Sequence, residues 1–239
     1  MTFFNEISFR LGQFIQEQTD SELRALTGSI HGSLLGLLAL LLGFTFSMSM
    51  QRYDNRSQAL IDEVNAIGTM SLRSELLAPN TAKSMQTLLN DYTQLRIEAS
   101  DVALTDSTAR RDYIKRTEQM QKLMWDELSA AIQTGEMQPV IAGLLVNALN
   151  DVIETQGKRN GLLYLHVPEV VFLLLFLVFV ITGGIIGYSG GLSGHRMIAP
   201  TLIVSILILL VVFIIIDLDR PRRGMIQISN DLLLDLKPN

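Results

Sequence analysis

The charged side chains best placed to act on ions crowd the end of the last long apolar run of the chain. They are Asp217, Asp219 and Arg220, and two further arginines, Arg52 and Arg56, follow the first apolar run. Opposite charges at the edge of an apolar region can pair with one another and anchor the chain. Alternatively, they can line a vestibule that concentrates small ions. The residues alone leave both interpretations open.

No other arrangement of side chains in the sequence predicts catalysis, a cofactor or a metal site. The chain has no cysteine, which excludes disulfides and thiolate chemistry. Its three histidines are far apart, and Pro168 lies between His166 and Glu169, which spoils a helical pair of metal ligands. No arrangement of serine, histidine and aspartate suggests nucleophilic catalysis. We therefore expect no catalytic residue, no metal and no cofactor, and do not expect an enzyme.

Three long stretches without Asp, Glu, Lys or Arg must position these charges. They cover residues 30–50, 170–194 and 197–216. A helix rises about 1.5 Å per residue, so roughly 20 apolar residues cross the hydrocarbon core of a bilayer. The sequence therefore predicts an all-α integral membrane protein, in contact with the lipid bilayer, with transmembrane helices at 28–50, 169–189 and 197–217.

Residues 51–168, between the first and second membrane helices, read as ordinary soluble sequence. Apolar residues recur there at helical spacing, and no run alternates with period two, so we expect a helical bundle and no sheet. The first membrane helix should continue into this bundle until Pro79 stops it. Asp106 or Ser107 is expected to cap one bundle helix, and Trp125 is expected to lie in the core. The net charge is −5 and no basic block is present, which excludes nucleic acid as an expected partner.

The two ends of the chain carry weaker patterns. Residues 1–27 form an amphipathic segment, whose helix would lie in the membrane interface or pack on a neighbouring subunit. Residues 218–239 form a C-terminal tail with a short helix. Near the end of the second membrane helix, Gly183 and Gly187 make a G-x-x-x-G step, which predicts close helix packing, with a hinge as the alternative.

Several motifs resemble a known family. The stretch LLGF at 41–44, with Arg52 and an aromatic residue after it, resembles the second membrane helix of bestrophin ion channels. The motifs EVNAIGT at 63–69 and DLDRPRRG at 217–224 more closely resemble the bacterial bestrophin-like family, long catalogued as a domain of unknown function. With the spans between them, the matching motifs cover residues 34–236.

The resemblance implies a homo-oligomer, expected to be a pentamer, with a central ion pore. Bestrophins narrow this pore with three apolar side chains at i, i+4 and i+8, and the matching positions here are Gly36, Leu40 and Phe44. Gly36 departs from the pattern and cannot constrict a pore, so the narrow part would be two rings long. The first bestrophin membrane helix and the acidic calcium-binding cluster of animal bestrophins are not recognisable.

Positive charges near the spans predict the orientation. One side has seven basic residues and the other has three (Arg52, Arg56, Lys158, Arg159, Arg220, Arg222 and Arg223 against Arg10, Arg24 and Arg196). Because basic residues favour the cytoplasmic side, the bundle and the C-terminus are expected in the cytoplasm. With the bacterial resemblance, this places the chain in the inner membrane.

Two functions of different classes follow from these patterns. The first is a channel that passes small inorganic ions through a pore lined by the first membrane helix. Bestrophins generally imply anions and bacterial relatives imply cations, and the sequence shows no filter of either sign. The second is a membrane-anchored scaffold or sensor whose bundle binds a cytoplasmic partner. A water-accessible central axis would distinguish the channel from the scaffold.

Overall fold

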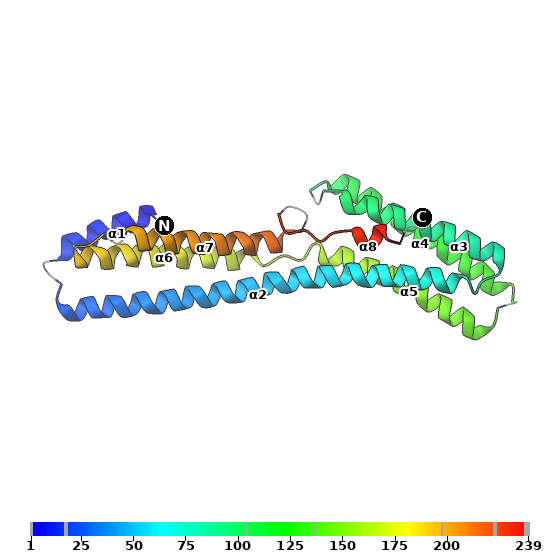
Figure 1. Ribbon diagram of the computed structural model, residues 1–239, viewed down its shortest axis with the longest axis horizontal. Helices are drawn as coiled ribbons and strands as arrows, with labels where there is room; N and C mark the ends of the chain where they lie inside the picture. Colours follow the sequence, from blue (N-terminus) through cyan, green and yellow to red (C-terminus); the bar gives the residue numbers. More distant parts are fainter. Residues whose placement is uncertain are drawn as a thin grey trace. The chain divides into compact units, whose positions relative to one another are not determined.

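The computed structural model describes residues 2–16, 19–103, 105–135, 137–196, 198–221 and 224–236. These residues form α-helices and no strand, which confirms the predicted all-helical fold (Figure 1). The helices are α1 (Thr2–Ile15), α2 (Ser21–Ser74), α3 (Pro79–Asp101), α4 (Ser107–Gln133), α5 (Pro139–Leu162), α6 (Glu169–Ser193), α7 (Ile198–Asp219) and α8 (Asp231–Leu234). The expected start of the third membrane helix, Met197, lies outside the described residues, as do Arg222 and Arg223.

The chain divides into two compact units. The membrane unit comprises Met1–Arg52 and His166–Arg220, and the bundle unit comprises Tyr53–Leu165 and Pro221–Asn239. The long helix α2 has 54 residues and contributes to both.

The membrane unit contains α1, the first part of α2, α6 and α7. Among the described residues, α2, α6 and α7 provide three stretches that are long and apolar enough to cross a bilayer. Pro168 immediately precedes α6, where its fixed φ favours helix initiation. Gly194 ends α6 in the left-handed region, with φ of 70°, a conformation that favours glycine. The chain is therefore a membrane protein with apolar helices of spanning length.

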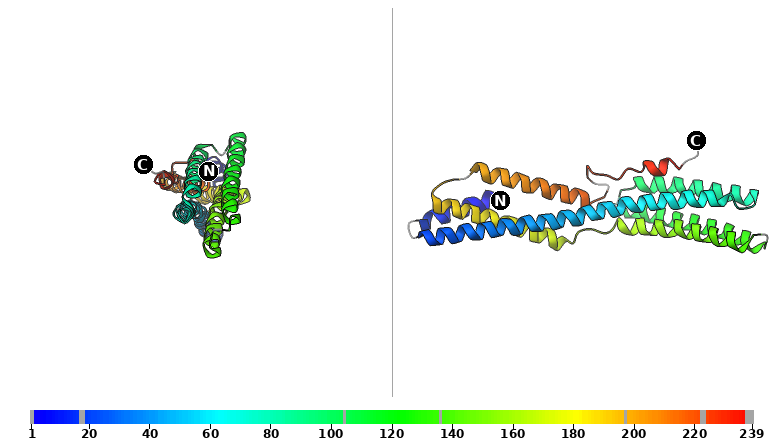
Figure 2. Two further views of the ribbon diagram at one scale, coloured as in Figure 1. Left: turned by 90° about the vertical axis from the view of Figure 1, so that its right-hand side faces the viewer. Right: turned by 60° about the horizontal axis from the view of Figure 1, so that its bottom comes forward.

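Helix α1 lies alongside the C-terminal half of α6 (Figure 2). Its buried face includes Phe9 and Gly12, and both residues contact α6. The packing partner of the amphipathic segment is therefore α6 of the same chain, which neither interpretation from the sequence included.

The bundle unit contains the second part of α2 together with α3, α4, α5 and α8. Figure 1 shows α3 and α4 side by side, and α8 contacts α3. An apolar core cluster draws on every one of these helices, and its buried residues include Met70, Met85, Leu89, Tyr92, Met124, Leu128, Leu145, Leu149, Val152 and Leu233.

Local signals at the helix ends explain where the bundle helices begin. The carboxylate of Asp106 accepts hydrogen bonds from the backbone N–H groups of Thr108 and Ala109, so of the two candidates Asp106, and not Ser107, caps α4. Pro79 is the first residue of α3, where its missing N–H is harmless. Pro79 therefore marks the boundary between α2 and α3 as the first residue of α3.

Trp125 does not lie in the core, and that prediction was wrong. Its side chain is 41% exposed on α4, whereas the adjacent Met124 is fully buried. Successive residues on a helix point about 100° apart, so the stripe that buries Met124 and Leu128 leaves Trp125 outside it.

Candidate functional site

The expected pore positions form an exposed stripe on α2. Leu40 is 54% exposed and Phe44 is 61% exposed within the single chain. Gly36 is also exposed, and no neighbouring atom lies within 4 Å of the place where a Cβ would be. The structure therefore places all three positions on a part of α2 that no other described segment of the chain covers.

The opposite face of the same helix is packed. Leu38 is only 2% exposed and joins Leu175 and Val178 of α6 in an apolar cluster. Two polar residues, Thr45 and Ser49, continue this buried face, and the Thr45 hydroxyl donates to the carbonyl oxygen of Leu41 at 2.7 Å. The membrane part of α2 therefore has one face that packs within the chain and one face that is exposed.

Asp219 holds together three segments at one edge of the membrane unit. Its buried carboxylate accepts a hydrogen bond from the backbone N–H of Val167 at 2.9 Å. The Nε of Arg52 lies 3.9 Å from Asp219 Oδ1, and the Nδ1 of His166 lies 3.9 Å from Oδ2. These contacts join the end of α7, the segment that precedes α6, and α2, so they support the salt-bridge interpretation of Arg52 and Asp219.

The other predicted edge residues have different surroundings. Asp217 is buried near the end of α7. Arg220 is exposed and lines, with Glu169, an otherwise apolar cavity of about 390 Å³ between α2, α6 and α7. Arg56 is buried and belongs to the bundle unit.

The glycines of α6 provide the surface on which α1 rests. A Cβ on Gly187 would overlap the backbone of Asn5, and one on Gly191 would overlap the backbone of Phe9. The carbonyl oxygen of Gly183 accepts a hydrogen bond from Nδ2 of Asn5 at 3.1 Å. Backbone approach of this kind requires small residues, as in membrane helix pairs generally.

A bulkier residue at Gly187 is expected to loosen α1. The variant Gly187→Ala should lose about 1–3 kcal/mol of stability, because the new methyl group has no room beside the Asn5 backbone. Hydrogen exchange of the α1 amides in the purified chain measures the effect. The matched control is Gly184→Ala, whose Cβ would meet only the Ser8 hydroxyl at 3.3 Å. Equal protection of α1 in the two variants would contradict this packing.

The sequence analysis missed a buried charge cluster in the bundle unit. Glu63 of α2 is 0% exposed and lies between two arginines. Nε of Arg96 donates to Glu63 Oε1 at 2.6 Å, and Nη1 of Arg159 donates to Oε2 at 2.5 Å. Since Arg96 is on α3 and Arg159 on α5, this one carboxylate connects three helices.

The electrostatics of this cluster favour its ionised form. Burial alone would raise the pKa of Glu63, but the two arginine charges and their hydrogen bonds lower the pKa below its ordinary value. Burial likewise opposes the charge on Arg96, whereas the carboxylate of Glu63 raises the pKa of that guanidinium. Glu63 and Arg96 therefore stay charged at neutral pH.

The spacing of these residues contained a signal of their burial. Arg96 follows Leu89 by seven positions and Tyr92 by four, so it continues the buried face of α3. Arg159 follows Val152 by seven positions on α5, and Glu63 lies three positions after Leu60 on α2. Charged residues at core positions of separate helices predict a buried ion cluster.

Metal binding finds no support among the described residues, where no group of three or more His, Cys, Asp or Glu side chains could hold an ion.

Comparisons with known proteins connect the chain with one family. A family model described as Bestrophin-like domain matches residues 2–233. A solved variant of a bacterial bestrophin homologue from Klebsiella pneumoniae is 16% identical, with a TM-score of 0.71, over 98% of this chain and 96% of the other. A second variant under the same description is 16% identical, with a TM-score of 0.70, over 98% and 94%. At this identity the likeness shows a shared fold. No curated protein matches the sequence.

Proposed function

Because the chain belongs to the bestrophin-like family, we propose that it assembles into an oligomeric ion channel whose pore is lined by α2. The oligomer is a homopentamer, as the resemblance to bestrophins implies. Small inorganic ions pass along its axis. The bundle unit and the C-terminus lie in the cytoplasm of a bacterial cell, and the membrane unit lies in the inner membrane.

The observation that carries this proposal is the two-sided character of the membrane part of α2. Leu38, Thr45 and Ser49 pack within the chain, while Leu40 and Phe44 are exposed. A symmetric ring of such helices would turn the exposed stripe toward a common axis and keep the packed face toward α6.

The side chains on the exposed stripe suit a narrow apolar neck. Rings of Leu40 and Phe44 would form two successive constrictions, and such rings can gate a pore by dewetting. Gly36 adds no side chain and would leave the pore wide at its level. Ser47 and Gln51 continue the exposed face beyond Phe44, and their polar groups can coordinate a passing ion.

Ion flux from vesicles tests this function. Purified protein reconstituted into vesicles loaded with potassium chloride should release ions faster than protein-free vesicles. Separate potassium and chloride electrodes would give the sign of the permeant ion. If the vesicles release ions no faster than protein-free vesicles, and the folded protein forms no ring-shaped oligomer, the scaffold is supported instead.

Cysteine labelling tests the proposed orientation. The chain has no native cysteine, so Asn90→Cys introduces a single thiol on an exposed position of α3. A membrane-impermeant maleimide should not label this variant in intact cells and should label it after lysis. The control is His195→Cys, in the exposed turn after α6, which should label from outside. Labelling of Asn90→Cys in intact cells would overturn the cytoplasmic assignment.

A further inference from the structure

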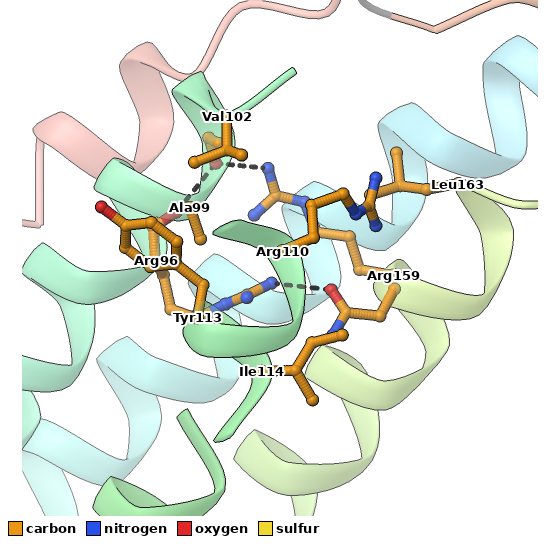
Figure 3. A pocket seen from close by; sticks show the side chains of 10 residues that line it. Arg96, Ala99, Val102, Arg110, Tyr113, Ile114, Arg159 and Leu163 are labelled. Carbon is orange, nitrogen blue, oxygen red and sulfur yellow. Dashed lines mark hydrogen bonds between the residues drawn. The ribbon is translucent and has the colours of Figure 1, made fainter. Parts of the chain in front are cut away.

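Three arginines of the bundle unit line one small pocket at the ends of three helices. Arg96 comes from α3, Arg110 from α4 and Arg159 from α5 (Figure 3). Polar groups of Ser100 and Asn160 share the lining, and the remaining lining residues are Ala99, Val102, Tyr113, Ile114 and Leu163. Among the described residues, none that lines the pocket carries a negative charge.

The positive charge at this pocket is only partly compensated. Glu63 pairs with Arg96 and Arg159, so one carboxylate faces two guanidinium groups. Arg110 adds a third, which stacks over the ring of Tyr164 at 4.8 Å. The other hydrogen bonds of the paired arginines go to neutral acceptors: Asn160 Oδ1, Ser100 Oγ and Asn230 Oδ1. Among the described residues that line or contact the pocket, three guanidinium groups therefore face one carboxylate.

One hydrogen-bond donor of the cluster has no acceptor. The Nη1 atom of Arg110 is buried and lacks a hydrogen-bond partner. A buried donor in a folded protein is nearly always satisfied by protein, water or an ion. The pocket has a volume of about 20 Å³, which suits one water-sized or monatomic species and not a larger molecule.

We propose that this pocket binds a single chloride ion, held by Arg110 together with Arg96 and Arg159. A monatomic anion fits the volume, gives the unsatisfied donor a partner and reduces the excess positive charge through charge-assisted hydrogen bonds. The bound ion joins α3, α4 and α5 at one end of the bundle, so chloride stabilises the bundle unit. The site is separate from the proposed pore residues, and its occupancy is measurable without ion conduction.

Thermal unfolding of the full chain in detergent tests the proposal. Circular dichroism at 222 nm follows unfolding while sodium chloride replaces sodium gluconate at constant ionic strength. We expect the midpoint of unfolding to rise with chloride and then saturate, because a ligand that binds only the folded state stabilises it. Arg110→Gln should abolish this rise. The control is Arg111→Gln, which removes the same charge from an exposed neighbouring position outside the pocket.

Each result decides for or against the site. A wild-type midpoint that is equal in chloride and gluconate would mean that a water fills the pocket, and would overturn the proposal. An unchanged chloride response in Arg110→Gln would do the same. If Arg110→Gln does not fold, crystals of the wild-type chain soaked in bromide give the answer. An anomalous peak between the three arginines supports the site, and its absence there refutes it.

Discussion

Replacing Glu63 by glutamine is expected to destabilise the bundle unit by about 3–5 kcal/mol, because two buried guanidinium groups would lose the carboxylate that pairs with both of them. Removing one charge of a buried ion cluster leaves its partners unpaired, and this is among the most destabilising kinds of single substitution. Thermal or denaturant unfolding of the purified chain measures the loss. Trp125 is the only tryptophan and lies on α4, so its fluorescence reports directly on the bundle unit.

The neighbouring Asp62 provides a matched control. It also pairs with a basic residue of α5, Lys158, at 2.8 Å, but both side chains are partly exposed to solvent. Asp62→Asn should therefore cost about 0–1 kcal/mol, the usual range for surface ion pairs. A loss in Glu63→Gln no larger than the loss in Asp62→Asn would show that the buried cluster contributes little.

The stabilisation by Glu63 should also depend on pH. Because the folded-state pKa of Glu63 is lowered, its contribution is fully present above the unfolded-state pKa of about 4.3. The contribution is lost as the pH falls through the folded-state pKa. The difference in stability between the wild type and Glu63→Gln should therefore be constant near neutral pH and shrink in acid.

Shortening Phe44 to alanine should raise ion conduction several-fold. The aromatic ring is exposed on α2, and in the proposed ring of subunits it is the bulkier of the two apolar side chains that narrow the pore. Loss of the ring would widen the neck and favour its hydration. Single-channel recording of the variant in a planar bilayer measures unitary conductance and open probability.

Phe46→Ala is the control for Phe44→Ala. Phe46 is also an exposed phenylalanine of α2, but it lies two positions on and so about 200° around the helix. Phe46→Ala should therefore leave ion conduction unchanged. An unaltered current in an active Phe44→Ala channel would remove Phe44 from the pore.

The elements with strong local signals could be predicted from the sequence. Charge-free stretches of spanning length gave the membrane helices, because a bilayer admits few alternatives to such segments. Asp106 predicted its cap, since an aspartate accepts hydrogen bonds from the first free N–H groups of a helix.

Features that depend on distant contacts could not be predicted in the same way. The packing of α1 on α6 depends on the backbone of Asn5 meeting Gly187, and these residues are far apart in the sequence. The pairing of Glu63 with Arg96 and Arg159 depends on three helices lying in register. The prediction that Trp125 is buried was wrong because its position on α4 places it outside the buried stripe.

Single-channel recording of the purified wild-type protein in a planar bilayer, with asymmetric salt, tests the channel proposal most directly. The proposal predicts discrete unitary currents, and their reversal potential would give the sign of the permeant ion. If neither the folded, monodisperse wild type nor Phe44→Ala gives unitary currents, the channel proposal is contradicted and a membrane-anchored scaffold is favoured.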